Sequence, residues 1–278
     1  MSGGLAALLG QPFLRYAFIA GAAIAAASGL VGYFVVLRSQ VFTGDALSHV
    51  AFTGALGALA AGADLLVGLY GACVLVAVAM AVLGFRGRAD DTVIGSVFAW
   101  ILGLGALFLS IYTTSSAGAD GTSGVNVLFG TIFGLSASQA VIDSVVAVCV
   151  CAALILIARP LLFASLDGAV ASARRVPVRT LSTVFLGLVG VTAAAATQAV
   201  GALLLLGLLA APAGAAQRLT ARPYRGMWLS ALIAICSVWI GLVIAYAAPQ
   251  IPPSFGILAV ATTSYLIAIA FTANGRRA

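Results

Sequence analysis

Long apolar segments, separated by short polar or arginine-bearing breaks, make up almost the whole chain of 278 residues. Hydrophobic residues account for 63% of the sequence and charged residues for only 7%, whereas a soluble domain carries roughly a quarter charged residues. Too few charges are present to cover a water-exposed surface. The pattern therefore predicts an all-α, polytopic transmembrane helix bundle, forming a single transmembrane domain over 1–278.

The lengths of the apolar segments predict about nine membrane spans, with eight or ten as alternatives. The expected spans are 12–37, 45–62, 64–85, 92–112, 138–158, 180–198, 199–217, 227–247 and 254–272. The segment Gly124–Leu135 is too short to cross. We expect it to be a re-entrant or interfacial piece packed against the bundle.

The positions of the thirteen arginines predict the orientation of the bundle. With nine crossings, every arginine except Arg15 falls on one side of the membrane. Because cytoplasmic loops carry the excess of basic residues, we expect the N-terminus outside and the C-terminus in the cytoplasm. The net charge of +6 is explained by this topology, so no nucleic-acid partner is expected.

The chain contains no lysine and no glutamate. A P-loop requires the lysine of GxxxxGK to reach the β- and γ-phosphates of ATP. This chain therefore cannot bind and hydrolyse ATP by that device. It is not expected to be an enzyme, and ATP hydrolysis would have to come from a separate partner chain.

The sequence GDALSH contains the only histidine, His49, with Asp45 four residues before it. On a helix these residues share a face. Imidazole and carboxylate together suit zinc, manganese or iron(II), and ionisable groups inside spans usually mark sites or pathways. One interpretation is therefore a divalent metal site. The alternative is that Asp45 caps the helix and that His49 is satisfied by a neighbouring carbonyl or hydroxyl.

Other aspartates carry weaker signals. Asp90 and Asp91 precede an expected helix, where acids complement the helix dipole. Asp143 lies near the start of its span, and we expect it to act as a cap or to be solvated at the interface. Asp64 and Asp120 are expected near the outer surface, with no specific role.

The longest expected cytoplasmic loop runs from about 159 to 180. Within it, the sequence LDGAVASARRVPV could form a short helix that ends at Pro177. Such a helix is either a solvated connector or, in an ATP-driven transporter, the place where an ATPase subunit docks.

Four segments together resemble the permeases of bacterial metal ABC importers for zinc, manganese and iron. They are FVVLRSQVFTGDALSHVAFTG at 34–54, DDTVIGSVF at 90–98, NVLFGTIFG at 126–134 and VGALLLLGLLAAPAGAAQRL at 200–219. The resemblance runs over nearly the whole chain, and GDALSH matches the family signature residue for residue. Two positions depart from the pattern. Arg175 stands where the family usually has glycine, and Thr53 where proline is common.

The resemblance implies a type II ABC importer-like fold in a bacterial plasma (inner) membrane. Its implied partners are a second permease copy, most simply as a homodimer, two ATP-binding cassette subunits, and an extracellular or periplasmic metal-binding protein. No cofactor is expected to be bound permanently, because the metal ion is the substrate and ATP binds the partner. Asp45 and His49 match the family's metal ligands. The residues at pattern positions of the implied ATPase-coupling loop are Asp167, Ala171, Ala173, Val176 and Pro177.

The implied activity is import of a divalent transition metal ion by alternating access. A siderophore or cobalamin ABC permease would share the fold, but it would need a large cavity rather than the pair Asp45 and His49. A secondary metal transporter would work without an ATPase, with Asp45 and Asp143 as carriers. A structural membrane scaffold would not need an acid and a histidine together in one span.

Overall fold

A computed structural model describes residues 12–84, 91–114, 129–130, 132–202 and 205–275, and every regular element among them is a helix. In chain order the elements are α2 (Pro12–Leu37), α3 (Val41–Ala60), α4 (Leu65–Leu83), α5 (Asp91–Thr114), the 3-10 helix η3 (Ile132–Gly134), α7 (Ala137–Leu166), α8 (Gly168–Ala173), α9 (Val178–Val200), α10 (Leu205–Leu219), α11 (Pro223–Ala247) and α12 (Pro253–Gly275). The expected all-α bundle is confirmed.

Each of the nine expected spans corresponds to one helix. Seven of these helices are long and apolar enough to cross a membrane, namely α2, α4, α5, α7, α9, α11 and α12. Helix α3 has 20 residues, but the polar residues around GDALSH lower its hydropathy. Helix α10 has only 15 residues, which is shorter than the roughly 20 that a bilayer requires.

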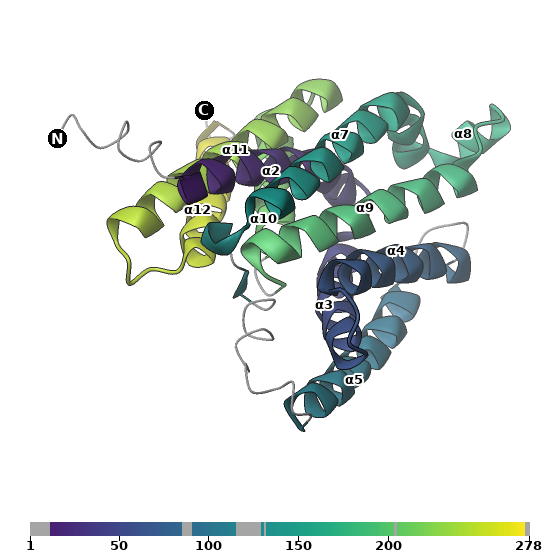
Figure 1. Ribbon diagram of the computed structural model, residues 1–278. Coiled ribbons are helices and arrows are strands. Elements are labelled where there is room, and N and C mark those ends of the chain that lie inside the picture. The colour runs from purple at the N-terminus through teal and green to yellow at the C-terminus, as the bar shows by residue number, and fades with distance from the viewer. Residues whose placement is uncertain (1–11, 85–90, 115–128, 131, 203–204, 276–278) are drawn as a thin grey trace.

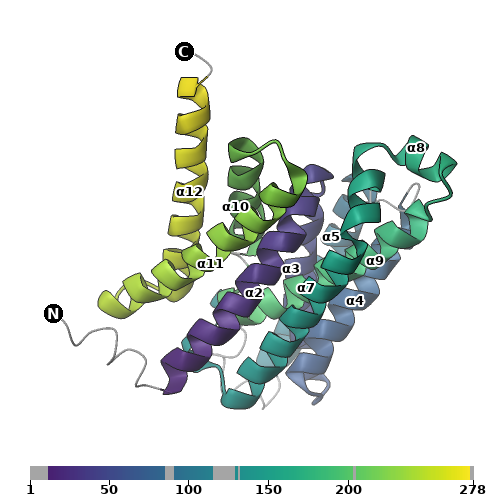
Figure 2. The ribbon, with the colours of Figure 1, turned by 90° about the horizontal axis from the view of Figure 1, so that it is seen from above.

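Helices α2 and α9 form the interior of the bundle (Figures 1 and 2). The most apolar window of each is 72% buried, compared with 17% for α5 and 22% for α12. Helix α2 packs against α7, α9, α10 and α11, and Figure 2 places it between α11 and α7. The outer helices present large apolar side chains such as Trp100 and Leu156. This is the surface expected of a bundle surrounded by lipid.

Helices α3, α4 and α5 pack together on one side of α9 (Figure 1). Gly54 on α3 and Gly68 on α4 face each other, and a β-carbon built at either position would collide with the carbonyl oxygen of the other. Small residues allow membrane helices to approach this closely. On the other side of α3, the Thr53 hydroxyl donates a hydrogen bond to the Ile101 carbonyl of α5 at 3.1 Å.

The expected re-entrant segment lies partly outside the described residues, at 124–128 and 131. Its described part includes Gly130 and the turn η3. Gly130 has a φ of +75°, and a β-carbon there would lie 2.5 Å from the Ala199 carbonyl oxygen. The segment thus packs against the end of α9, where Gly201, with a φ of +99°, terminates the helix.

Helix α10 begins at Leu205 and not at 199, as the apolar pattern had indicated. The reason is the backbone at Gly201, whose positive φ is incompatible with a continuing right-handed helix. Apolar content alone does not reveal such a break, because the residues on both sides are equally hydrophobic.

Candidate metal-binding and coupling sites

The connection between α2 and α3 determines where the GDALSH sequence lies. Ser39 has a φ of +55°, and the Gln40 amide donates to the Val35 carbonyl at 2.9 Å, which closes the end of α2. Gln40 is then the N-cap residue of α3. Asp45 is consequently inside the helix, in its second turn, and the alternative interpretation of Asp45 as a cap is wrong.

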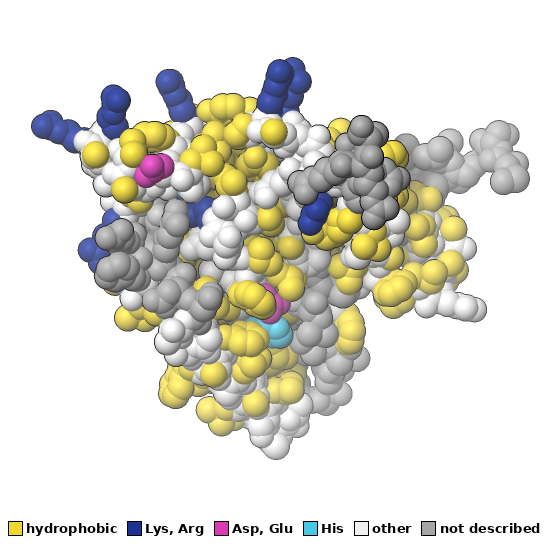
Figure 3. All heavy atoms as spheres, turned by 180° about the vertical axis from the view of Figure 1, so that it is seen from behind, with side chains coloured by type: hydrophobic (Ala, Val, Ile, Leu, Met, Phe, Trp, Pro, Cys, Tyr) yellow, Lys and Arg dark blue, Asp and Glu magenta, His cyan; other side chains and the backbone are white. Residues whose placement is uncertain are grey.

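Asp45 and His49 lie on successive turns of α3, and both are half-buried, whereas Gly44, Ala46, Leu47 and Ser48 between and beside them are buried. Within the described part of the chain, neither side chain makes a hydrogen bond or an ion pair. Figure 3 shows the histidine colour next to an acidic side chain on one face of the molecule, with hydrophobic side chains around both. An acid and an imidazole are therefore held side by side and available to a ligand.

The His49 ring packs edge-on against Phe98 of α5, with ring centroids 5.1 Å apart and planes at 68°. This contact restricts the imidazole on the side of α5. Ser48, the other polar residue of the motif, donates instead to the Asp45 backbone carbonyl at 2.7 Å. Its hydroxyl is thus engaged within the helix and does not face the same way as the pair.

The described residues of one chain offer an incomplete ligand set. Among the described residues, no group of three or more histidine, cysteine or acidic side chains is close enough to hold a metal ion. Asp45 and His49 would supply two of the four or more ligands that zinc, manganese or iron requires. Any further ligands would come from outside the described side chains, for example from water or from another chain.

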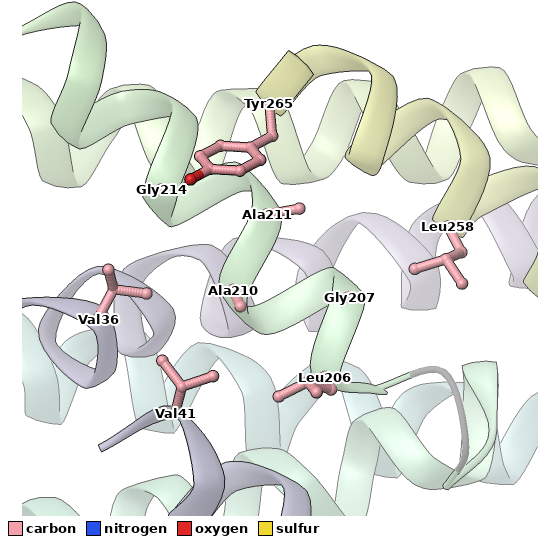
Figure 4. A pocket seen from close by; sticks show the side chains of 9 residues that line it. All are labelled: Val36, Val41, Leu206, Gly207, Ala210, Ala211, Gly214, Leu258 and Tyr265. Carbon is pink, nitrogen blue, oxygen red and sulfur yellow. The ribbon is translucent and has the colours of Figure 1, made fainter. Parts of the chain in front are cut away.

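An apolar cavity of about 520 Å³ opens beside the N-terminal end of α3 (Figure 4). Val41, one turn before Asp45, lines it together with Val36 at the end of α2. Helix α10 contributes Gly207, Ala210 and Gly214, which place no atom larger than a methyl group into the space. The cavity therefore adjoins the helix turn that precedes the acid.

The remaining acids differ in their environments. Asp64 is the N-cap of α4 and accepts hydrogen bonds from Leu66 and Val67.

Asp143 is fully buried, which contradicts the expectation of a cap or interfacial residue. Ser136 caps α7 instead, in a capping box with Gln139, so Asp143 lies about two turns inside the helix. Asp90 and Asp120 lie outside the described residues.

Asp143 accepts a hydrogen bond from the Tyr70 hydroxyl of α4 at 2.9 Å. Sequence reasoning missed this pair. The only signal was an aspartate inside an apolar run, because nothing in the spacing of residues 70 and 143 indicates that they meet.

The expected coupling loop forms a short helix between two long ones, and Figure 2 shows α8 beyond the ends of α7 and α9. Asp167 caps α8 by accepting from the Ala169 and Val170 amides at 3.0 and 2.9 Å. Ala171 is buried, whereas Asp167, Ala173 and Pro177 are exposed. Pro177 is the N-cap residue of α9.

The end of α8 explains one departure from the family pattern. The Val176 amide donates to the Ala171 carbonyl and the Arg175 amide to the Ser172 carbonyl, which together form a Schellman motif. Arg175 occupies the left-handed position of this motif, with a φ of +62°. Glycine is the residue that this position favours, in agreement with the residue that the resembling permeases usually have there.

The segments that carry the family resemblance meet in space. His49 of the GDALSH segment contacts Phe98 of DDTVIGSVF, and Gly130 of NVLFGTIFG packs on Ala199, Val200 and Gly201. Over residues 10–272 the chain matches the model of the ABC 3 transport family. The chain belongs to this family. The ABC 3 fold thus brings these separated sequences into contact.

Two curated relatives are similar along most of their length. The manganese transport system membrane protein MntC of Halalkalibacterium halodurans is 28% identical over 268 residues, which cover 95% of this chain and 88% of MntC. The manganese import system permease protein ScaB of Streptococcus parasanguinis is 28% identical over 236 residues, or 84% of this chain and 82% of ScaB.

A solved structure of PsaBC from Streptococcus pneumoniae in complex with Fab has the same fold. The TM-score is 0.82 at 24% sequence identity, with 96% of this chain and 95% of that chain covered. The expected resemblance to metal ABC importer permeases is therefore confirmed. As an ABC 3 member, the chain is a membrane-embedded permease subunit, and ATP is hydrolysed on separate subunits.

Proposed function

We propose that this ABC 3 permease imports a divalent transition metal ion into the cytoplasm by alternating access, with Asp45 and His49 as transient ligands. The single observation that carries the proposal is the pairing of these two side chains on successive turns of α3, half-buried and without other polar partners in the described chain. A carboxylate and an imidazole match manganese, iron(II) and zinc. Ionisable groups are costly within a membrane domain and usually have a role in transport.

A second permease copy would complete the ligand set. Two copies related by a two-fold axis present the same residues to each other, so a pair of α3 helices would supply two carboxylates and two imidazoles. Four such ligands suffice for a divalent transition metal ion. The partial exposure of the pair at the surface of one chain supports this arrangement.

The exposed surface of α8 supports a docking role for the segment between α7 and α9. Leu166 and Val170 are exposed apolar side chains, and Arg174 and Arg175 lie beside them. An apolar centre with basic residues at its rim suits a protein partner. We propose that an ATP-binding cassette subunit docks here, on the cytoplasmic side, through the segment that contains Asp167, Ala171, Ala173, Val176 and Pro177.

Manganese is the first substrate to test, since the relatives MntC and ScaB are named as manganese transport proteins. A metal-binding protein outside the plasma membrane would deliver the ion, as in other ABC importers. The ligand types alone do not separate manganese from iron or zinc, because selectivity between these ions depends on geometry and availability.

The test is uptake of radioactive manganese, iron and zinc by cells that lack the chain and regain it as wild type or variant. We expect Asp45→Ala and His49→Ala to abolish uptake while the complex still assembles and its ATPase still binds ATP. Asp64→Asn, which removes a charge from the N-cap of α4 but keeps an acceptor, is the matched control and should transport normally. Wild-type uptake in both site variants would refute the proposed ligands.

ATP dependence separates this proposal from a secondary metal transporter. In vesicles that contain the complex, metal uptake should require ATP and should persist after the proton gradient has been collapsed. Uptake that continues without ATP would contradict the proposed mechanism.

A further inference from the structure

The buried pair Asp143 and Tyr70 is not explained by the proposed metal site. Asp143 on α7 is fully buried, and its Oδ1 accepts the Tyr70 hydroxyl of α4 at 2.9 Å. The other carboxyl oxygen, Oδ2, has no hydrogen-bond partner within the described chain. Because an acid buried among helices is costly unless it is bonded, the Tyr70 hydroxyl is its principal stabilising contact.

Helix α4, which carries Tyr70, also contacts the backbone of the proposed metal site. Cys73, one turn beyond Tyr70, is fully buried, and its thiol donates to the Leu47 carbonyl of α3 at 3.4 Å. Leu47 lies between Asp45 and His49 in the sequence. The thiol is a weak donor, but it contacts the backbone of the very turn that positions both ligands.

The backbone of Cys73 also contacts α9. On α9, a β-carbon built at Gly190 would lie 2.8 Å from the Cys73 carbonyl oxygen, so the two backbones are in direct contact. Together with the close approach of Gly54 and Gly68, this contact leaves α4 little room to shift away from α3. A displacement of α4 is therefore transmitted to α3.

On the other side of the Asp143–Tyr70 pair, helix α7 leads to α8. Asp143 belongs to α7, a helix of 30 residues that ends at Leu166, directly before the Asp167 cap of α8. A docked subunit that moves α8 would therefore act directly on the end of the helix that carries Asp143. The hydrogen bond of Asp143 with Tyr70 links this helix to α4.

We infer that the Asp143–Tyr70 hydrogen bond is a positioning contact that couples movement of the α8 segment to the geometry of Asp45 and His49, through α4 and the Cys73–Leu47 contact. The inference rests on the proposed function and deepens it. Tyr70, Cys73 and Asp143 are positioning residues here, because none of them touches the ion. A contact of this kind should alter the response to metal more than the assembly of the complex.

The test uses the complete transport complex in vesicles, with manganese as the probe. We measure manganese uptake per permease molecule, together with ATP hydrolysis in the absence and presence of the metal-loaded binding protein. Tyr70→Phe and Asp143→Ala should each lower metal-stimulated hydrolysis and uptake about fivefold or more, with basal hydrolysis unchanged. Asp143→Asn, which keeps an oxygen acceptor for Tyr70, should restore most of the activity.

Two further comparisons separate coupling from simple destabilisation. The double variant Tyr70→Phe with Asp143→Ala should be no worse than either single variant, since both remove the same bond. Tyr246→Phe on α11, where the side chain is 42% exposed, should behave as wild type. Additive losses in the double variant, or a lowered amount of complex with normal uptake per molecule, would overturn the inference.

The Cys73–Leu47 contact provides a second route to the same answer if the Tyr70 variant does not reach the membrane. Cys73→Ala should lower metal-stimulated hydrolysis, and Cys73→Ser, which keeps a donor, should restore it. Normal stimulation in Cys73→Ala would overturn the inference. If the wild-type complex takes up manganese and the Tyr70→Phe and Cys73→Ala variants do so equally well, the coupling alone is refuted. If the wild-type complex takes up no metal ion, the proposed function itself is refuted.

Discussion

Gly54 on α3 and Gly68 on α4 are in backbone contact, so neither position has room for a β-carbon. This crossing holds the helix with Asp45 and His49 against the helix with Tyr70 and Cys73. Small residues at such crossings are a general means of packing membrane helices, where close van der Waals contact replaces the hydrophobic effect. The position of the proposed site thus depends on residues that have no chemistry of their own.

Replacing Gly54 with alanine should separate α3 from α4. We expect Gly54→Ala to lower the free energy of unfolding by about 1–3 kcal/mol, the usual cost of overpacking, and to reduce metal uptake as well. Thermal denaturation of the purified chain in detergent measures the first effect. Gly71→Ala, on α4 like Gly68 but with open space around the new methyl group, is the control and should not lower stability. Equal stability of the two variants would contradict the crossing.

Replacing Arg175 with glycine should stabilise the coupling segment. Its left-handed backbone is costly for a residue with a side chain, and we expect Arg175→Gly to raise the free energy of unfolding by about 1 kcal/mol. The control is Arg174→Gly, because Arg174 has a φ of −86° and gains nothing from glycine. Hydrogen exchange of the amides in 168–178 would report the local effect. Faster exchange in Arg175→Gly than in wild type would refute this account of the Schellman motif.

Arg38 connects the end of α2 to α9 through its side chain. We expect lysine at this position to destabilise the protein. The guanidinium donates to the Ser182 hydroxyl at 2.7 Å and stacks over the Phe185 ring at 5.2 Å. Because an ammonium group lacks the planar surface for this stacking, Arg38→Lys should cost about 1–2 kcal/mol of stability. Arg15→Lys, at an exposed position, should cost nothing in the same denaturation measurement. An unchanged midpoint for Arg38→Lys would contradict a structural role of the stacking.

The arginine distribution predicts a cytoplasmic C-terminus and an outside N-terminus. A fluorescent protein fused to the C-terminus should therefore fold and fluoresce, and alkaline phosphatase at the same place should be inactive. The reverse result would place α8 outside and would remove it from contact with an ATPase.

Local sequence was sufficient for most helix positions. Span 12–37 agrees with α2, and span 227–247 falls within α11, because runs of apolar residues leave a helix as the favourable structure in lipid. The same signal was too coarse at Gly201, where a backbone angle breaks the helix. It also placed Asp143 at a cap or in a solvated interface, whereas Ser136 provides the cap and Asp143 is buried against Tyr70.

By itself, the sequence determined that this protein is a membrane helix bundle, that it lacks the P-loop lysine, and that Asp45 and His49 share a helix face. These properties follow from composition and from helical periodicity, which act over a few residues. The tertiary structure decided that His49 meets Phe98, that Tyr70 meets Asp143, and that Cys73 contacts the turn between the proposed ligands. Such contacts join residues far apart in the chain, and they arise only from the way the helices cross, which the packing of small side chains controls.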